Sequence, residues 1–216
     1  MRKLFSSVAA ILTIASTTCV EAAPAYSWNL SRDMMNGITT NPIGEEGVWT
    51  AMYDIAGTSH NASNYQTLSS YTSNYAGYPL AALGNGYEGW LIVGVSTQTH
   101  TFSGSPIAIR RGIPILHPGV ANSSIIRWKS PISGNITIAG KIADANPLCG
   151  NGINWFIDKY GTTLMLGSLA NGDNGANILQ QNIPVSVGTY LYFIVSSKDY
   201  DQGCDSTFLD ITVTSP

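Results

Sequence analysis

The chain has 216 residues and carries ten Lys and Arg against thirteen Asp and Glu, a formal net charge of −3 that argues against a nucleic-acid-binding surface. Charged residues make up 11% of the chain, against roughly 25% in an average soluble domain, while hydrophobic residues reach 44%. This composition excludes a disordered chain and a coiled coil, and it predicts a protein that folds around a core.

The N-terminus has the three-part plan of a secretory signal peptide. Two basic residues precede an apolar stretch from Leu4 to about Ile14, and small residues follow it. Because this stretch is well short of the roughly 20 residues that span a bilayer, and no other segment comes close, we expect no membrane span. Cleavage fits after Ala22 or after Ala25, and we take residues 1–22 as the signal peptide. The mature protein is then secreted, either extracellular or periplasmic.

Strand patterns recur every ten to fifteen residues along residues 26–216, with no helical period between them. Apolar and polar residues alternate most clearly in the C-terminal half, as expected of half-buried strands. The predicted strands are Ser27–Leu30, Gly47–Tyr53, Gly89–Val95, Ile107–Arg110, Ser124–Lys129, Asn135–Ile142, Gly152–Asp158, Thr162–Leu166, Thr189–Val195 and Thr207–Thr214. Their spacing predicts an all-β antiparallel sandwich or barrel that forms a single domain.

Residues 55–87 differ from the rest of the chain. Ser, Thr, Asn, Gly and Tyr dominate this stretch, and its longest apolar run is Pro79–Leu83. A structureless loop of this length is uncommon inside a compact domain. We therefore expect either a functional loop or a segment that contains a short helix or strand.

Removal of the signal peptide leaves two cysteines, Cys149 and Cys204. Two cysteines in a compartment that permits oxidation should form a disulfide, and the alternative is a pair of buried free thiols. A disulfide requires Cα atoms within about 7 Å of each other. The loops around the two cysteines would then share one end of the sandwich.

Acidic residues are concentrated near the two cysteines. Asp199, Asp201 and Asp205 surround Cys204, and Asp144 precedes Cys149. Clustered carboxylates are the ligands that Ca²⁺ requires, so these four residues form a candidate calcium site. The alternative is a set of solvated loops in which Asp and Asn form turns.

Several short motifs that contain Gly, Pro or Trp, or alternate apolar residues, are spread along residues 26–216. They are Asn41-Pro42 with Val48-Trp49, Ile115–Gly119, Ile126-Arg127-Trp128, Ser130-Pro131, Gly134, Ile136 to Gly140, Val187–Val195 and Asp205 to Leu209. Residues 26–216 thus resemble the bacterial secreted β-sandwich modules that often precede a PEP-CTERM surface-sorting tail, although the sequence ends without such a tail. The resemblance implies a jelly-roll fold and an extracellular protein, and it brings no catalytic residues.

Tyrosines are interleaved with amide side chains in the 55–87 stretch and occur again near residue 190. Sugar rings stack on aromatic faces while their hydroxyls bond amides and carboxylates, so these tyrosines are candidate ligand-binding residues. The same residues would suit a protein partner, or they could pack the loop onto the sheet. The candidates are Tyr65, Tyr71, Tyr75, Tyr78, Tyr87, Tyr190 and Tyr192.

Catalytic constellations are nearly absent from the sequence. It contains no Gly-x-Ser-x-Gly elbow and no His-Glu-x-x-His zinc motif, and its histidines, His60, His100 and His117, lie in separate segments. Mature Glu45, Glu46 and Glu88 offer few pairs for a glycosidase. We therefore expect a non-catalytic module that binds a glycan or a cell-surface partner. The alternatives are a structural matrix protein and a small extracellular hydrolase, and the sequence does not indicate the oligomeric state.

Overall fold

The computed structural model describes residues 25–44, 46–54, 61–75, 77–85, 91–101 and 108–216, so the predicted signal peptide lies outside the described residues. The N-terminal elements are β1 (Ser27–Asn29), α1 (Leu30–Gly37), β2 (Trp49–Asp54), η1 (Ala62–Asn64), β3 (Tyr65–Thr67), β4 (Tyr71–Thr72), β5 (Leu80–Asn85), β6 (Leu91–Ser96), β7 (His100–Thr101) and β8 (Ala108–Ile109). They are followed by β9 (Pro114–His117), β10 (Ser124–Lys129), β11 (Gly134–Asp144), β12 (Ile153–Lys159), β13 (Thr162–Leu169), β14 (Ala176–Val185), β15 (Tyr190–Ser197) and β16 (Thr207–Thr214).

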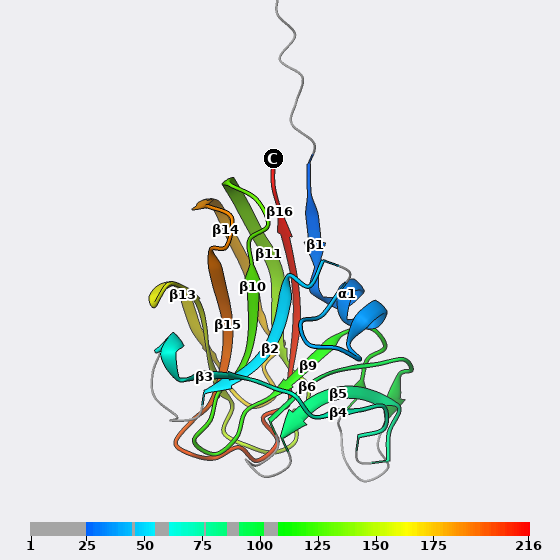
Figure 1. The fold of residues 1–216 in the computed structure, drawn as a ribbon. Coiled ribbons are helices and arrows are strands. Elements are labelled where there is room, and N and C mark those ends of the chain that lie inside the picture. Colours follow the sequence, from blue (N-terminus) through cyan, green and yellow to red (C-terminus); the bar gives the residue numbers. More distant parts are fainter. Residues whose placement is uncertain (1–24, 45, 55–60, 76, 86–90, 102–107) are drawn as a thin grey trace, which may run out of the picture.

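Most strands form two facing antiparallel sheets, as in a jelly-roll-like β-sandwich, and β7 and β8 pair in a separate two-stranded sheet (Figure 1). The eight-stranded sheet has the order β14-β11-β16-β9-β6-β5-β4, with β1 paired to β16, and the six-stranded sheet has the order β13-β12-β15-β10-β2-β3. Ser27 at the start of β1 pairs with Thr214 at the end of β16. The predicted all-β antiparallel sandwich is confirmed. Among the described residues, no helix is both long and apolar enough to cross a membrane.

The main hydrophobic core lies between the two sheets. Alternation along β15 turns Leu191, Phe193 and Val195 inward, and each is at most 1% exposed. The same alternation buries three residues of β11 and three of β16 in this core: Ile136, Ile138, Ile142, Leu209, Ile211 and Val213. Because successive side chains of a strand point to opposite faces, the intervening residues of β15 lie on the outer face of the six-stranded sheet.

Several elements differ from the expectation, namely α1, β14 and the short strands β7 and β9, which were not among the predicted strands. The predicted strand at the N-terminus ends at Asn29, whose side chain caps α1 by accepting a hydrogen bond from the Arg32 amide at 2.8 Å. Only Leu30 and Met34 are buried in α1, which is too few apolar positions for a visible helical period. Strand β14 was not expected, because Ile178 and Ile183 are both buried although they are an odd number of residues apart. A register shift in the β11–β14 pairing permits this.

The 55–87 stretch is not one long loop. Its described part contains η1 and three strands, of which β3 pairs with β2 in the six-stranded sheet while β4 and β5 belong to the eight-stranded sheet. The stretch therefore crosses from one sheet to the other. This crossing divides its tyrosines between two surfaces.

Candidate functional site

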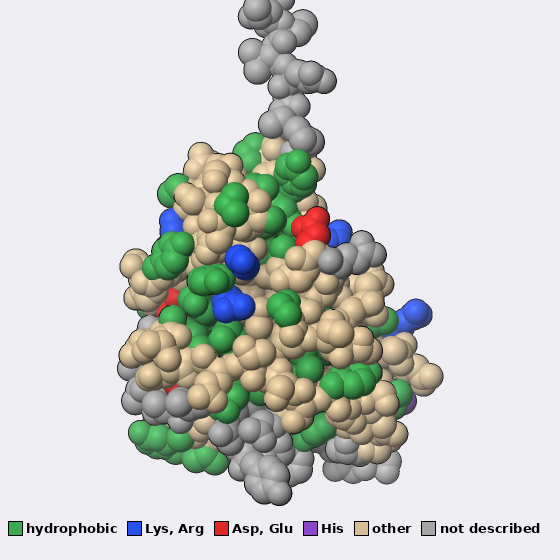
Figure 2. All heavy atoms as spheres, viewed as in Figure 1, with side chains coloured by type: hydrophobic (Ala, Val, Ile, Leu, Met, Phe, Trp, Pro, Cys, Tyr) green, Lys and Arg blue, Asp and Glu red, His purple; other side chains and the backbone are tan. Residues whose placement is uncertain are grey.

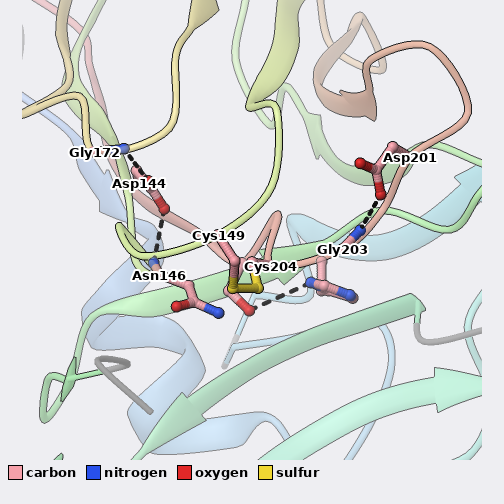
Figure 3. Close-up of a disulfide and its surroundings, with 9 residues drawn as sticks. Asp144, Asn146, Cys149, Gly172, Asp201, Gly203 and Cys204 are labelled. Carbon is pink, nitrogen blue, oxygen red and sulfur yellow. Dashed lines mark hydrogen bonds between the residues drawn. A yellow bond between two sulfur atoms is a disulfide. The ribbon is translucent and has the colours of Figure 1, made fainter.

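The disulfide fixes one end of the sandwich. Cys149 and Cys204 are bonded with a Cα–Cα distance of 5.5 Å, which confirms the predicted pairing (Figure 3). The β11–β12 and β15–β16 connections therefore meet at the same end, as the sequence predicted. We call this the disulfide end.

Two of the predicted calcium ligands act as turn formers. Both carboxylate oxygens of Asp144 accept hydrogen bonds at 2.7 Å, one from the Asn146 amide and one from the Gly172 amide. Asp201 accepts a bond from the Gly203 amide at 2.9 Å. Figure 3 shows Asp144 and Asp201 on opposite sides of the disulfide. These contacts match the alternative in which Asp residues shape solvated loops.

The predicted calcium site is not assembled. Across the parts of the chain that the structure describes, no three His, Cys, Asp or Glu side chains lie close enough together to hold a metal ion. Asp144, Asp199, Asp201 and Asp205 therefore do not form one ligand set.

Asp205 is the buried acid of the disulfide end. It is 3% exposed, and its Oδ2 atom has no hydrogen-bond partner. Burial raises the pKa of Asp205 to about 7, and the carboxylates of Asp201 and Asp144 add to this shift, while Lys198 and the Gly152 amide oppose it. Near neutral pH, the protonated and the ionised forms of the Asp205 side chain are therefore both populated.

The candidate tyrosines do not form one surface. Tyr65, Tyr190 and Tyr192 lie on the outer face of the six-stranded sheet, whereas Tyr71 on β4 and the Tyr75 and Tyr78 side chains beside β5 belong to the other sheet. Tyr87 lies outside the described residues. Tyr65 and Tyr192 are 9% and 6% exposed and meet edge-to-face at 5.1 Å, so they mainly pack against the sheet.

The outer face of the six-stranded sheet carries alternating polar and apolar rows across its strands. Thr50, Arg127, Tyr192 and Asp158 occupy one row by register. Nη2 of Arg127 donates to Oγ1 of Thr50 at 2.9 Å, and the guanidinium lies 4.6 Å from the centre of the Tyr190 ring. Figure 2 shows a molecular surface dominated by uncharged atoms, with hydrophobic side chains in small groups. Sheet packing therefore uses most of the aromatic rings on the outer face.

A cavity of about 260 Å³ opens where β2, β12 and β15 reach the disulfide end. We call it the end cavity. Its walls combine aromatic rings, carboxylates, amides and hydroxyls. The lining residues are Asp54, Tyr65, Val120, Ala121, Asn122, Ser123, Asn154, Phe156, Ile194, Ser196, Ser197, Asp199 and Tyr200.

The Tyr65 side chain in the wall of the end cavity stays protonated and uncharged. Burial, followed by the carboxylates of Asp158 and Asp54, raises the pKa of Tyr65 well above its ordinary value. The Tyr65 hydroxyl therefore keeps its proton and can donate a hydrogen bond. Asp54 is 1% exposed, so its carboxylate sits in the wall rather than in bulk solvent.

Tyr200 enters the cavity wall from a tight turn. The Asp201 amide donates to the Lys198 carbonyl at 2.8 Å, and Asp199 and Tyr200 have φ angles of 49° and 60°. Two positive φ angles in a four-residue turn define type I′, which prefers Asn and Gly. The turn instead presents a tyrosine that is 75% exposed. Tyr200 was not among the candidates predicted from the sequence, although an aromatic residue between two aspartates after a strand was an available signal.

A second cavity, of about 500 Å³, lies on the outer face of the eight-stranded sheet. Arg110 packs over the Phe208 ring at 5.3 Å, and Lys141 and Asp210 also line this cavity. Its three aspartates each accept hydrogen bonds from neighbouring backbone amides or from the Ser31 hydroxyl. Because this cavity is lined by both basic and acidic side chains, its charge does not indicate a particular class of ligand.

A serine–histidine contact bears on the hydrolase alternative. The Ser206 hydroxyl lies 3.3 Å from Nδ1 of His117. Burial lowers the pKa of His117 to about 4, which makes it a weak base, and the cavity beside Ser206 has a volume of only about 10 Å³. No substrate fits there. Glu46 accepts a bond from Trp28 Nε1 at 2.7 Å, and His60, Glu45 and Glu88 lie outside the described residues.

Comparisons with known proteins give structural likenesses alone. No family model and no curated protein matches the chain. A family 51 carbohydrate-binding module from Clostridium perfringens, in complex with methyl-galactose, aligns with a TM-score of 0.37 at 7% identity, covering 48% of this chain and 69% of that chain. A family 61 module in complex with β-1,4-galactotriose aligns with a TM-score of 0.34 at 14% identity. The alignment covers 66% of this chain and 90% of that chain. A family 36 module in complex with calcium and xylotriose aligns with a TM-score of 0.32 at 14% identity. The alignment covers 58% of this chain and 93% of that chain.

Proposed function

We propose that this protein is a non-catalytic, glycan-binding β-sandwich that binds sugar in the end cavity. The observation that supports this proposal is the lining of that cavity. It combines the exposed ring of Tyr200 with the amides of Asn122 and Asn154 in one cavity lining. Sugar rings need an apolar face to stack on and polar groups to bond their hydroxyls, and this wall offers both.

The disulfide supports a secreted location for this activity. Disulfides persist in extracellular and periplasmic compartments and are rare in the cytosol. The Cys149–Cys204 bond fixes the loop that carries Asp199 and Tyr200. We therefore propose that the protein acts outside the cytoplasm, with the oxidised bond holding the cavity wall in place.

Tyr200→Gly is expected to weaken glycan binding at least about tenfold while raising the free energy of unfolding by about 1 kcal/mol. Binding falls because the stacking ring is lost, and stability rises because glycine adopts a φ of 60° without steric cost. A glycan array with residues 23–216 first identifies a binding sugar. Titration calorimetry and urea unfolding then measure the two effects.

Tyr160→Gly is the matched control. Tyr160 is 63% exposed, has a φ of 50° and lies in the β12–β13 turn, at the opposite end of the sandwich. It should show a similar gain in stability with unchanged affinity. Equal affinities for the two variants would show that the end cavity is not the glycan site, and an array without saturable binding would contradict the proposed function itself.

A further inference from the structure

We infer that the end cavity accepts only the end of a glycan, one or two neutral sugar rings, and discriminates against acidic sugars. This inference rests on the proposed function, because it specifies the ligand class of the same cavity. Three properties of the described residues support it: the packing of two aromatic rings on the outer face of the six-stranded sheet, the size of the cavity and the charge of its wall.

In the described part of the six-stranded sheet, two of the aromatic rings on the outer face are not accessible to a long glycan. Tyr65 and Tyr192 lie over the outer face and are themselves nearly buried. Beneath them, Met52, Ile125 and Ile194 are 6%, 0% and 4% exposed. The rings of Tyr65 and Tyr192 are therefore already packed against protein, and the most exposed ring, that of Tyr200, lies at the end of the sheet.

The cavity is also small. Its volume is about 260 Å³. Cavities that enclose drug-sized ligands hold roughly 300 to 1,000 Å³. One or two pyranose rings are the largest part of a glycan that such a space can enclose. Further rings of the same chain would extend into solvent and add few contacts.

The charge of the wall disfavours acidic sugars. Asp54 and Asp199 line the end cavity, and its lining, as far as the chain is described, includes no Arg, Lys or His. The neighbouring Lys198 points its Nζ away from the cavity lining, where it donates to the Leu169 carbonyl at 2.8 Å. A uronate in the cavity would place its carboxylate near the exposed carboxylate of Asp199, and like charges repel.

The first experiment titrates gluco-, galacto- and manno-oligosaccharides of one, two, four and six rings into residues 23–216 by calorimetry. Affinity is expected to increase from one ring to two and to change by less than about twofold from two rings to six. An increase of tenfold or more between two and six rings would overturn the inference while leaving the proposed function intact. Absence of binding to every member would instead count against the proposed function.

The second experiment compares the methyl glycosides of glucose, galactose and mannose with their uronates at low salt. The uronate of a bound sugar should bind at least about tenfold more weakly. Asp199→Asn should reduce this discrimination severalfold, because asparagine tolerates the φ of 49° and removes the charge.

Asp173→Asn is the control for this charge effect. Asp173 is exposed, lies outside the end cavity, and accepts a bond from the Gly175 amide that an asparagine oxygen can keep. It should leave the discrimination unchanged. Equal discrimination by both variants, or preferential binding of uronates by the unmodified protein, would overturn the inference.

Discussion

Replacing both Cys149 and Cys204 with serine is expected to lower the free energy of unfolding by about 4 kcal/mol. The bond spans 55 residues, and the chain-entropy relation for a loop of that length gives this value. It is a large share of the 5–15 kcal/mol that is typical of a domain. Urea unfolding of the oxidised protein and of the double variant measures the difference.

Reduction of the unmodified protein provides the control for the serine substitutions. It should reproduce the loss of stability without changing the sequence, and it should have no effect on the double variant. Because the bond also fixes the Asp199–Tyr200 turn, glycan affinity should fall in both cases. A loss below about 1 kcal/mol would show that the turn and strand contacts hold this end without the bond.

Stability is expected to fall by about 3 to 4 kcal/mol between pH 4 and pH 7 because of Asp205 alone. Its carboxyl has an ordinary pKa of 3.8, and burial, with Asp201 and Asp144, raises it to about 7 in the folded protein. The unfolded chain therefore releases this proton at lower pH than the folded protein does. The stabilisation is fully present below pH 4 and is lost as the pH rises through 7.

Asp205→Asn isolates this effect. Asparagine keeps an oxygen that can accept from the Gly152 amide, and it carries no charge to desolvate. Unfolding curves measured between pH 4 and pH 8 should therefore be flatter for the variant, which should be the more stable protein at pH 8. Parallel curves would contradict the assignment. Repeating the series with calcium and with EDTA tests whether a cation binds the ionised carboxylate, since a bound cation would remove the loss at high pH.

The strands of the C-terminal half were predictable because local pattern and burial agree there. Leu191, Phe193 and Val195 alternate with polar or aromatic neighbours, and a strand packed on one face against a core produces that alternation. Strand β14 was not predictable in this way, because its register shift breaks the period that identifies a strand. Helix α1 is too short to show a period of its own.

The candidate site was only partly predictable. The disulfide followed from the number of cysteines and the compartment, and it correctly placed the acidic loops at one end. The tyrosine surface did not follow from composition, because exposure depends on tertiary neighbours: Tyr192 is buried by Tyr65, while Tyr200 is exposed. Of the asparagines of the end cavity, Asn122 lies in the β9–β10 connection and Asn154 on β12, and only the fold brings them together.

The pairing of Ser27 with Thr214 determines how the sandwich can be attached to anything else. Both ends of the folded unit leave it side by side, far from Cys204 and the end cavity, as the C-terminus in Figure 1 illustrates. A bead, fluorescent label or neighbouring polypeptide joined at either end would therefore orient the cavity outward. Immobilisation through a terminal tag should leave sugar access unobstructed.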